Sequence, residues 1–94
     1  MKLKLNLKIS ILNLAPLRQG QNFKDAIDAM VKLAKKADEL GYERYWIAEH
    51  HNTKSVASSA TQLLIQRTLD NTKNIRVGSG GVMLPNHSPY IVAE

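Results

Sequence analysis

Three short apolar runs separated by helical patterns constrain the fold of this chain more than any other feature of its 94 residues. The runs lie at 9–14, 45–48 and 75–77, and they are rich in the β-branched, aromatic and aliphatic residues that buried strands favour. Each interval between runs is about 30 residues and holds one helical pattern, which is the spacing of a right-handed βαβ crossover. The sequence therefore predicts an α/β fold with parallel neighbouring strands.

The clearest helix is predicted between the first two strands. Asn22 is its expected N-cap, and Gly41 supplies a left-handed residue after its end. Its apolar positions recur at helical spacing: Phe23, Ala26, Ile27, Met30, Val31, Ala34, Ala37 and Leu40.

A second helix is expected between the last two strands, with Ser58 or Ser59 as its cap. Its predicted buried face holds Ala60, Leu63, Leu64 and Thr68. Residues 90–94 are typical of the first turn of a third helix. Because the chain stops there, we expect it to be the front part of a longer protein.

Ionisable side chains follow the second strand directly, as Glu49, His50 and His51. Carboxyl ends of parallel strands face the crevice or barrel mouth where ligands bind, and histidine titrates nearest to neutral pH. The motif predicts a general base or a substrate-orienting histidine, with Glu49 fixing the orientation of a neighbour. Since side chains alternate along a strand, at most one histidine is expected to face the site. The alternative is simply the polar start of a loop.

A metal site is the rival interpretation of the same motif. Adjacent side chains on one strand diverge, whereas compact histidine sites take ligands that share a face or come from separate elements. The chain has no cysteine, and His87 is its only further imidazole. We therefore predict no metal site; for His87 itself, a role in stabilising its loop is at least as well supported as ligand contact.

The glycine-rich segment 78–81 ends the third strand and resembles a phosphate-binding loop only weakly. A dinucleotide fingerprint opens a helix, but residues 82–85 intervene before any helix can begin. Glycines in such a place indicate a special backbone conformation or close approach of a flat ligand. Of the aromatic neighbours Tyr45 and Trp46, only one can face the barrel interior.

Composition narrows the class of protein. With 44% hydrophobic residues the chain can build a single core, and without cysteine it has no disulfides, which is compatible with a reducing cytoplasm. Residues 1–8 lack the apolar core of a signal peptide, and no run approaches the about 20 apolar residues of a membrane span. The net charge is +5, but acidic residues interleave with the lysines at 32–36 and no aromatics accompany them. We predict a soluble, cytoplasmic protein that binds neither nucleic acid nor membranes.

Three segments together, 10–16, 45–52 and 77–89, resemble the bacterial luciferase-like flavin-dependent monooxygenases. The resemblance implies a (β/α)₈ TIM barrel in which reduced flavin and O₂ oxidise an aldehyde or another small organic substrate. The family usually uses FMN, with a deazaflavin-using branch, so reduced FMN is the expected cofactor. His50 matches the family's catalytic base, Glu49 its orienting acidic neighbour, and Gly80-Gly81 the small pair whose non-proline cis peptide lies under the flavin ring.

The resemblance also bounds what this chain can do. Residues 1–94 correspond to an amino-terminal fragment of a single luciferase-like TIM-barrel domain, with three β-strands, two helices and the start of a third. The residues that hold the flavin phosphate come from later strands of such barrels. We expect the fragment to be inactive alone and to form a homo-oligomer, the alternative function being a non-catalytic, self-associating α/β fragment.

Overall fold

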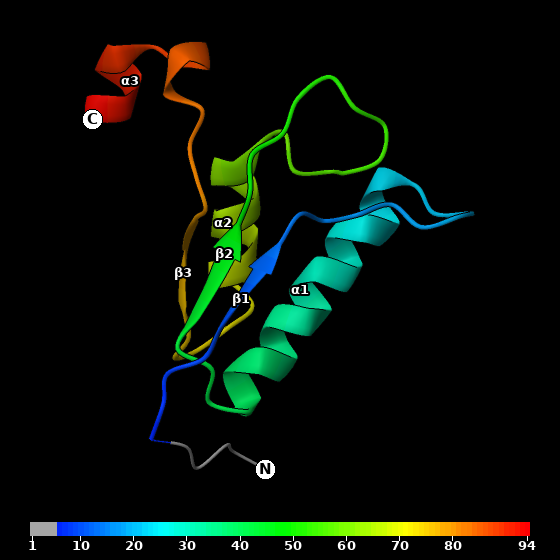
Figure 1. Cartoon of the computed structure of the whole chain (residues 1–94), viewed down its shortest axis with the longest axis vertical. Coiled ribbons are helices and arrows are strands. Elements are labelled where there is room, and N and C mark those ends of the chain that lie inside the picture. Colours follow the sequence, from blue (N-terminus) through cyan, green and yellow to red (C-terminus); the bar gives the residue numbers. More distant parts are fainter. Residues whose placement is uncertain (1–5) are drawn as a thin grey trace.

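The computed structural model describes residues 6–94 as a three-stranded parallel sheet with helices between the strands (Figure 1). The strands, in spatial order, are β1 (Ser10–Asn13), β2 (Arg44–Ile47) and β3 (Arg76–Ser79). The helices are α1 (Phe23–Glu39), α2 (Thr61–Leu69), the 3₁₀ turn η1 (Leu84–Asn86) and α3 (Pro89–Ala93). Residues 1–5, including the basic Lys2 and Lys4, lie outside the described part. The predicted order of elements and the parallel pairing are confirmed.

Helix α1 begins and ends where the sequence predicted. The Asn22 side chain accepts the Asp25 amide at 2.9 Å, and the Asp25 carboxylate accepts the Asn22 amide at 3.1 Å, which completes a capping box. Gly41 follows the helix with φ of +84°, a conformation that glycine adopts without steric cost. Phe23, expected on the buried face, is instead 52% exposed, because it borders the cavity described below.

The predicted serine cap of α2 was wrong. The N-cap is Ala60, which makes no side-chain capping bond, and the helix begins at Thr61. Ser58 lies before the helix, where its carbonyl accepts the His50 amide at 3.1 Å. The residue is therefore committed to the turn that closes onto the end of β2, and this long-range contact overrides its local capping preference.

The buried face of α2 also differs from the prediction at two positions. Ala60 and Leu63 are exposed, Leu63 at 71%, whereas Thr61, Leu64 and Thr68 are buried. Thr61 is oriented inward because its hydroxyl donates to the Ile47 carbonyl at 3.2 Å. A buried polar group with such a partner outweighs the hydrophobic preference of Leu63 for the core.

Strand β3 starts one residue later and ends two residues further on than the predicted 75–77, so that it includes Gly78. Gly78 pairs with Trp46 of β2, and a Cβ added at Gly78 would lie 3.0 Å from the Trp46 ring. Glycine thus allows the strand to continue beneath the indole, which explains why a residue with low strand preference lies inside β3.

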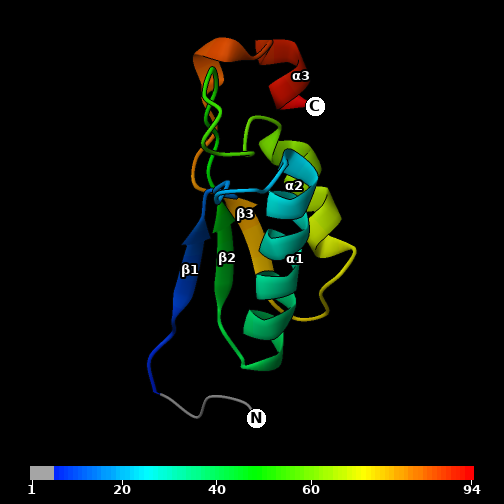
Figure 2. The ribbon, with the colours of Figure 1, turned by 90° about the vertical axis from the view of Figure 1, so that its right-hand side faces the viewer.

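Both long helices cover the same face of the sheet and leave the other face open (Figure 2). Tyr45 and Ile47 of β2 point into the covered core and are 0% exposed. The Tyr45 hydroxyl donates to the Met30 carbonyl of α1 at 2.9 Å, and burial raises the pKa of this phenol well above its ordinary value. The Trp46 side chain lies on the opposite face, beside Leu12, because successive side chains of a strand alternate. Of the adjacent residues Tyr45 and Trp46, only one therefore faces the open side, as predicted.

Within residues 6–94, no helix combines the length and apolar character needed to cross a membrane.

Candidate functional site

Glu49 lies just beyond β2 and is the centre of a cluster at the carboxyl ends of the strands. Its side chain is 0% exposed. Its carboxylate accepts hydrogen bonds from His51 Nε2 at 2.6 Å, from His87 Nε2 at 2.9 and 3.1 Å, and from the Met83 amide at 3.2 Å. A buried carboxylate is thereby satisfied by three donors from two separate segments of the chain.

These donors keep Glu49 ionised. The hydrogen bond from His51 is the largest cause, aided by His87 and Met83, and it lowers the pKa of Glu49 to about 2 although burial acts in the opposite direction. At neutral pH this carboxylate accepts hydrogen bonds and has no proton to give. It can orient the two imidazoles, but it cannot act as a general acid.

The expected pairing of Glu49 with His50 is not formed. Among residues 6–94, the hydrogen-bond partners of the Glu49 side chain are His51, His87 and Met83. Adjacent side chains of an extended segment diverge, whereas residues two apart lie on the same side, so Glu49 meets His51 and not His50. The two-residue spacing of Glu49 and His51 was the sequence signal that could have predicted their contact. His87 is 38 residues from Glu49, so no local pattern could have predicted that pair.

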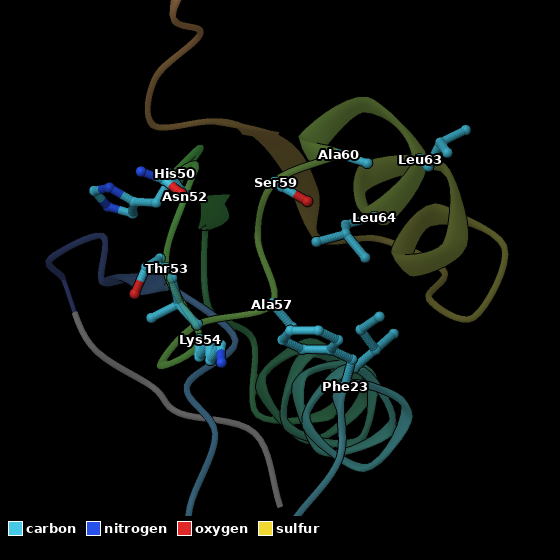
Figure 3. A pocket seen from close by; sticks show the side chains of 12 residues that line it. Phe23, His50, Asn52, Thr53, Lys54, Ala57, Ser59, Ala60, Leu63 and Leu64 are labelled. Carbon is cyan, nitrogen blue, oxygen red and sulfur yellow. The ribbon is translucent and has the colours of Figure 1, made fainter.

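His50 instead lines a separate cavity of about 640 Å³ between α1, α2 and the loop that joins β2 to α2 (Figure 3). Most of its wall is apolar, with Phe23 and Ile27 from α1 and Leu64 from α2. Among the lining residues, the ionisable ones are His50 and Lys54, and none is acidic. The cavity therefore suits an apolar or anionic group better than a cation.

The loop that carries His50 is held by the loop after β1. Pro16 and Val56 form an antiparallel bridge, flanked by the Leu17 amide on the Ser55 carbonyl at 2.9 Å and the Ala57 amide on the Ala15 carbonyl at 2.8 Å. Their pairing fixes the floor of the cavity, and only the folded chain brings them together.

Gly80 and Gly81 lie at the end of β3 and are exposed. Their peptide bond is cis, as the family resemblance implied. A Cβ on Gly80 would lie 3.1 Å from the Cβ of Trp46, so the flat group nearest this backbone is the protein's own indole. A Cβ on Gly81 would meet no atom within 4 Å, which leaves its backbone open to a ligand. Neither glycine lines the His50 cavity.

The predicted site residues thus divide between two surfaces. Glu49 is tied to the segment after Gly81 through Met83, whereas His50 opens onto the cavity on the α1–α2 side. In the part of the chain that the structure covers, no group of three histidines, cysteines or acids is arranged to hold a metal ion. In the Glu49 cluster both Nε2 atoms are directed at the carboxylate.

Comparison with known proteins identifies the family. A family model described as "Luciferase-like monooxygenase" matches residues 5–94. This chain belongs to the luciferase-like monooxygenases. Within that family it is 62% identical over 86 residues to the uncharacterized protein YddN of Bacillus subtilis (strain 168). The match covers 92% of this chain and 25% of YddN, so the chain spans about a quarter of that relative's length.

Solved structures of luciferase-like monooxygenases agree with the fold. The crystal structure of apo-MsnO8 matches with a TM-score of 0.89 and 43% identity, over 94% of this chain and 27% of that one. The oxygenating constituent of 3,6-diketocamphane monooxygenase from Pseudomonas putida, a type II Baeyer–Villiger monooxygenase in complex with FMN, matches with a TM-score of 0.83 and 26% identity, over 92% and 24% of the two chains. The predicted family and the partial TIM barrel are confirmed.

Proposed function

We propose that this chain, through its described residues 6–94, forms one wall of the flavin pocket in a monooxygenase that uses reduced FMN and O₂ to oxidise a small organic substrate. One observation carries the proposal: on the open side of the sheet, the exposed Gly80-Gly81 backbone follows directly on the tip of β3 and precedes Met83, whose amide donates to Glu49. The similarity to a protein that was crystallised with FMN favours FMN over a deazaflavin.

The residues present fit a flat ring. Gly81 has open space where a side chain would stand, and Gly80 is backed by Trp46, so a ring can approach the main chain directly. When bound, flavin supplies the redox chemistry with oxygen. The chain's own contribution at the ring face is the glycine backbone. His50 lies on the separate surface toward α1 and α2, where its exposed imidazole can accept a proton from a substrate that extends into that cavity.

The contact with flavin can be tested on the 94-residue chain by NMR titration with FMN. We expect amide shifts at Gly80 and Gly81 and at the Trp46 indole NH, at high FMN concentration because the phosphate-holding strands are absent. Gly81→Val should abolish the shifts by filling the open space. Ala29→Val, at an exposed position of α1, should leave them unchanged. Shifts confined to the helices would contradict the proposal.

The role of His50 requires a complete barrel that carries residues 1–94 as its amino-terminal segment. We expect His50→Ala to lower turnover about 100- to 10,000-fold, the usual contribution of a general base. Glu39→Gln, at an exposed position of α1 outside the cavity, should retain turnover. Unchanged turnover in His50→Ala would remove the proposed role. The 94-residue chain alone is expected to consume no oxygen with reduced FMN. Measurable consumption would show that residues from later strands are not needed to hold the flavin phosphate.

Self-association is the second candidate function, because several apolar side chains are exposed. Leu12 on the open sheet face is 57% exposed, and Tyr90 and Ile91 of α3 are 73% and 65% exposed. Edge strands β1 and β3 each have an unpaired side in the described sheet. We propose that the chain forms a homo-oligomer and that it is cytoplasmic. Sedimentation at several concentrations tests the oligomeric state, and a monomer at all of them would exclude self-association.

A further inference from the structure

We infer that Glu49 is a positioning residue which, with His51 and His87, clamps the segment after β3 onto the end of β2. The clamp sets the Gly80-Gly81 backbone and His50 in a fixed relation to one another. Its existence rests on contacts within this structure, whereas its importance for turnover rests on the proposed flavin function.

The glycine segment after β3 is anchored to the end of β2 at two points. The Gly80 amide donates to the Ile47 carbonyl at 2.9 Å, and the Met83 amide donates to the Glu49 carboxylate at 3.2 Å. Gly81 and Val82 therefore lie between two anchors that are only two residues apart at the end of β2. Without Glu49, the ladder bond at Gly80 would be the last connection of this segment to its neighbouring strand.

After Met83, the chain returns to the Glu49 carboxylate through the His87 side chain. The η1 turn, closed by the His87 amide on the Leu84 carbonyl at 3.0 Å, brings the His87 ring back to Glu49. Residues 83–87 are thus attached to Glu49 at both ends, and the His87 side chain is only 22% exposed. One carboxylate holds a whole loop that has little other packing, since residues 82–86 are exposed.

The backbone around His50 is held by its neighbours in the chain and by Ser58. It is flanked by Glu49 and His51, whose side chains bond to each other at 2.6 Å, and its own amide donates to the Ser58 carbonyl at 3.1 Å. The backbone is therefore fixed on both sides of His50, while the His50 side chain remains free to face the cavity. Glu49 positions His50 through the main chain and not by direct contact.

The clamp has a measurable signature in the two histidine rings. An ionised carboxylate only accepts hydrogen bonds, so each neutral ring must carry its proton on Nε2, leaving Nδ1 unprotonated. His50 has no such partner among the described residues, and it should populate both tautomers. Imidazole ¹⁵N shifts distinguish these cases directly.

The decisive experiment is imidazole NMR on the 94-residue chain at alkaline pH, where unperturbed histidines are neutral. We expect fixed Nε2–H tautomers for His51 and His87, and loss of that preference in at least one of them in Glu49→Gln. Glu39→Gln makes the same charge change at a side chain that is 69% exposed, and should have no effect. Mixed tautomers of both rings in the unaltered chain would overturn the inference.

A second variant covers the case in which Glu49→Gln does not fold. His87→Gln removes only the loop arm of the clamp, and it should leave His51 in the Nε2–H form while the amide resonances of 80–87 broaden or shift. If those amides keep their positions, the loop is held by something other than the clamp and the inference fails.

The catalytic consequence is tested in the complete-barrel protein. We expect Glu49→Gln to lower kcat about 100-fold, the cost of misplacing groups by about 1 Å, with a smaller change in the substrate KM. Unchanged kcat in a variant whose tautomers are freed would refute the positioning role. If the unaltered barrel neither binds FMN nor turns over, the proposed function fails, whereas the tautomer experiment still decides whether the clamp exists.

Discussion

The two faces of the sheet use alternate residues of the same strands for different purposes. On the face covered by α1 and α2, Tyr45 and Ile47 are 0% exposed and pack against Met30. On the open face, Leu12 is 57% exposed and the neighbours of Trp46 are glycines. Stability therefore depends mainly on one face, which leaves the other free to carry small residues that a flat ligand can approach.

The largest contrast should come from truncating one aliphatic side chain on each face. Ile47→Ala leaves a cavity in the covered core, and we expect a loss of about 3 kcal/mol in the free energy of unfolding. Leu12→Ala, on the open face, should cost less than about 1 kcal/mol. Urea unfolding of both variants measures the difference. The small loss at Leu12 is the result expected if the open face binds flavin; equal losses would instead support the second candidate function, because self-association through that face would bury Leu12.

The next largest loss of stability should come from removing the polar contact between α1 and the segment just before β3. Asp38 of α1 accepts the amides of Lys73, Asn74 and Ile75 at 2.7 to 3.0 Å, which ties the start of β3 to the helix. Burial acts to raise the pKa of Asp38, but these three donors outweigh it and lower the pKa below its ordinary value.

We expect Asp38→Asn to cost about 2 kcal/mol at neutral pH, because a charged acceptor is lost from three hydrogen bonds. Since the folded-state pKa is lowered, the stabilisation is complete above the ordinary pKa of 3.8 and disappears as the pH falls through the lower folded value. Asp28→Asn, which breaks only the exposed pair with Lys24, should cost far less than Asp38→Asn, because solvent screens that pair. Similar urea midpoints for the two variants would refute the special role of Asp38.

On the open face we expect a smaller effect from filling the space under Trp46. A Cβ at Gly78 would lie 3.0 Å from the ring, so Gly78→Ala must tilt the indole at a cost of about 1 kcal/mol. Because Trp46 is the single tryptophan, its emission spectrum reports the tilt. Gly81→Ala meets no atom within 4 Å and should leave the emission unchanged. An unshifted spectrum in Gly78→Ala would show that the ring does not pack on this strand.

The Glu49 cluster should make the stability of the fold depend on pH in the acid range. Because the folded-state pKa of about 2 lies below the ordinary 4.5, ionisation of Glu49 stabilises the fold fully above 4.5. This contribution is lost as the pH falls through about 2. The difference in the free energy of unfolding between the unaltered chain and Glu49→Gln should therefore shrink as the pH falls over that range. A difference independent of pH would contradict the lowered pKa.

Local patterns predicted the elements whose causes are local. The predicted N-cap at Asn22 and the left-handed Gly41 depend on residues within one turn of the helix ends, so both predictions were correct. The predictions for Ser58 and Leu63 were wrong because a distant strand decided them: Ser58 closes onto the β2 tip, and inward-facing Thr61 displaces Leu63 to the surface.

For the candidate site, the sequence by itself determined which residues stand at the strand tips. Strand periodicity and βαβ spacing put Glu49, His50 and Gly80-Gly81 at the carboxyl ends of neighbouring parallel strands. Only the tertiary structure decided which side chains are in contact. His51 and His87 bond to Glu49, whereas His50 lines a separate cavity. The physical reason is that position along a strand follows from local periodicity, whereas a hydrogen bond across 38 residues depends on where the intervening chain returns.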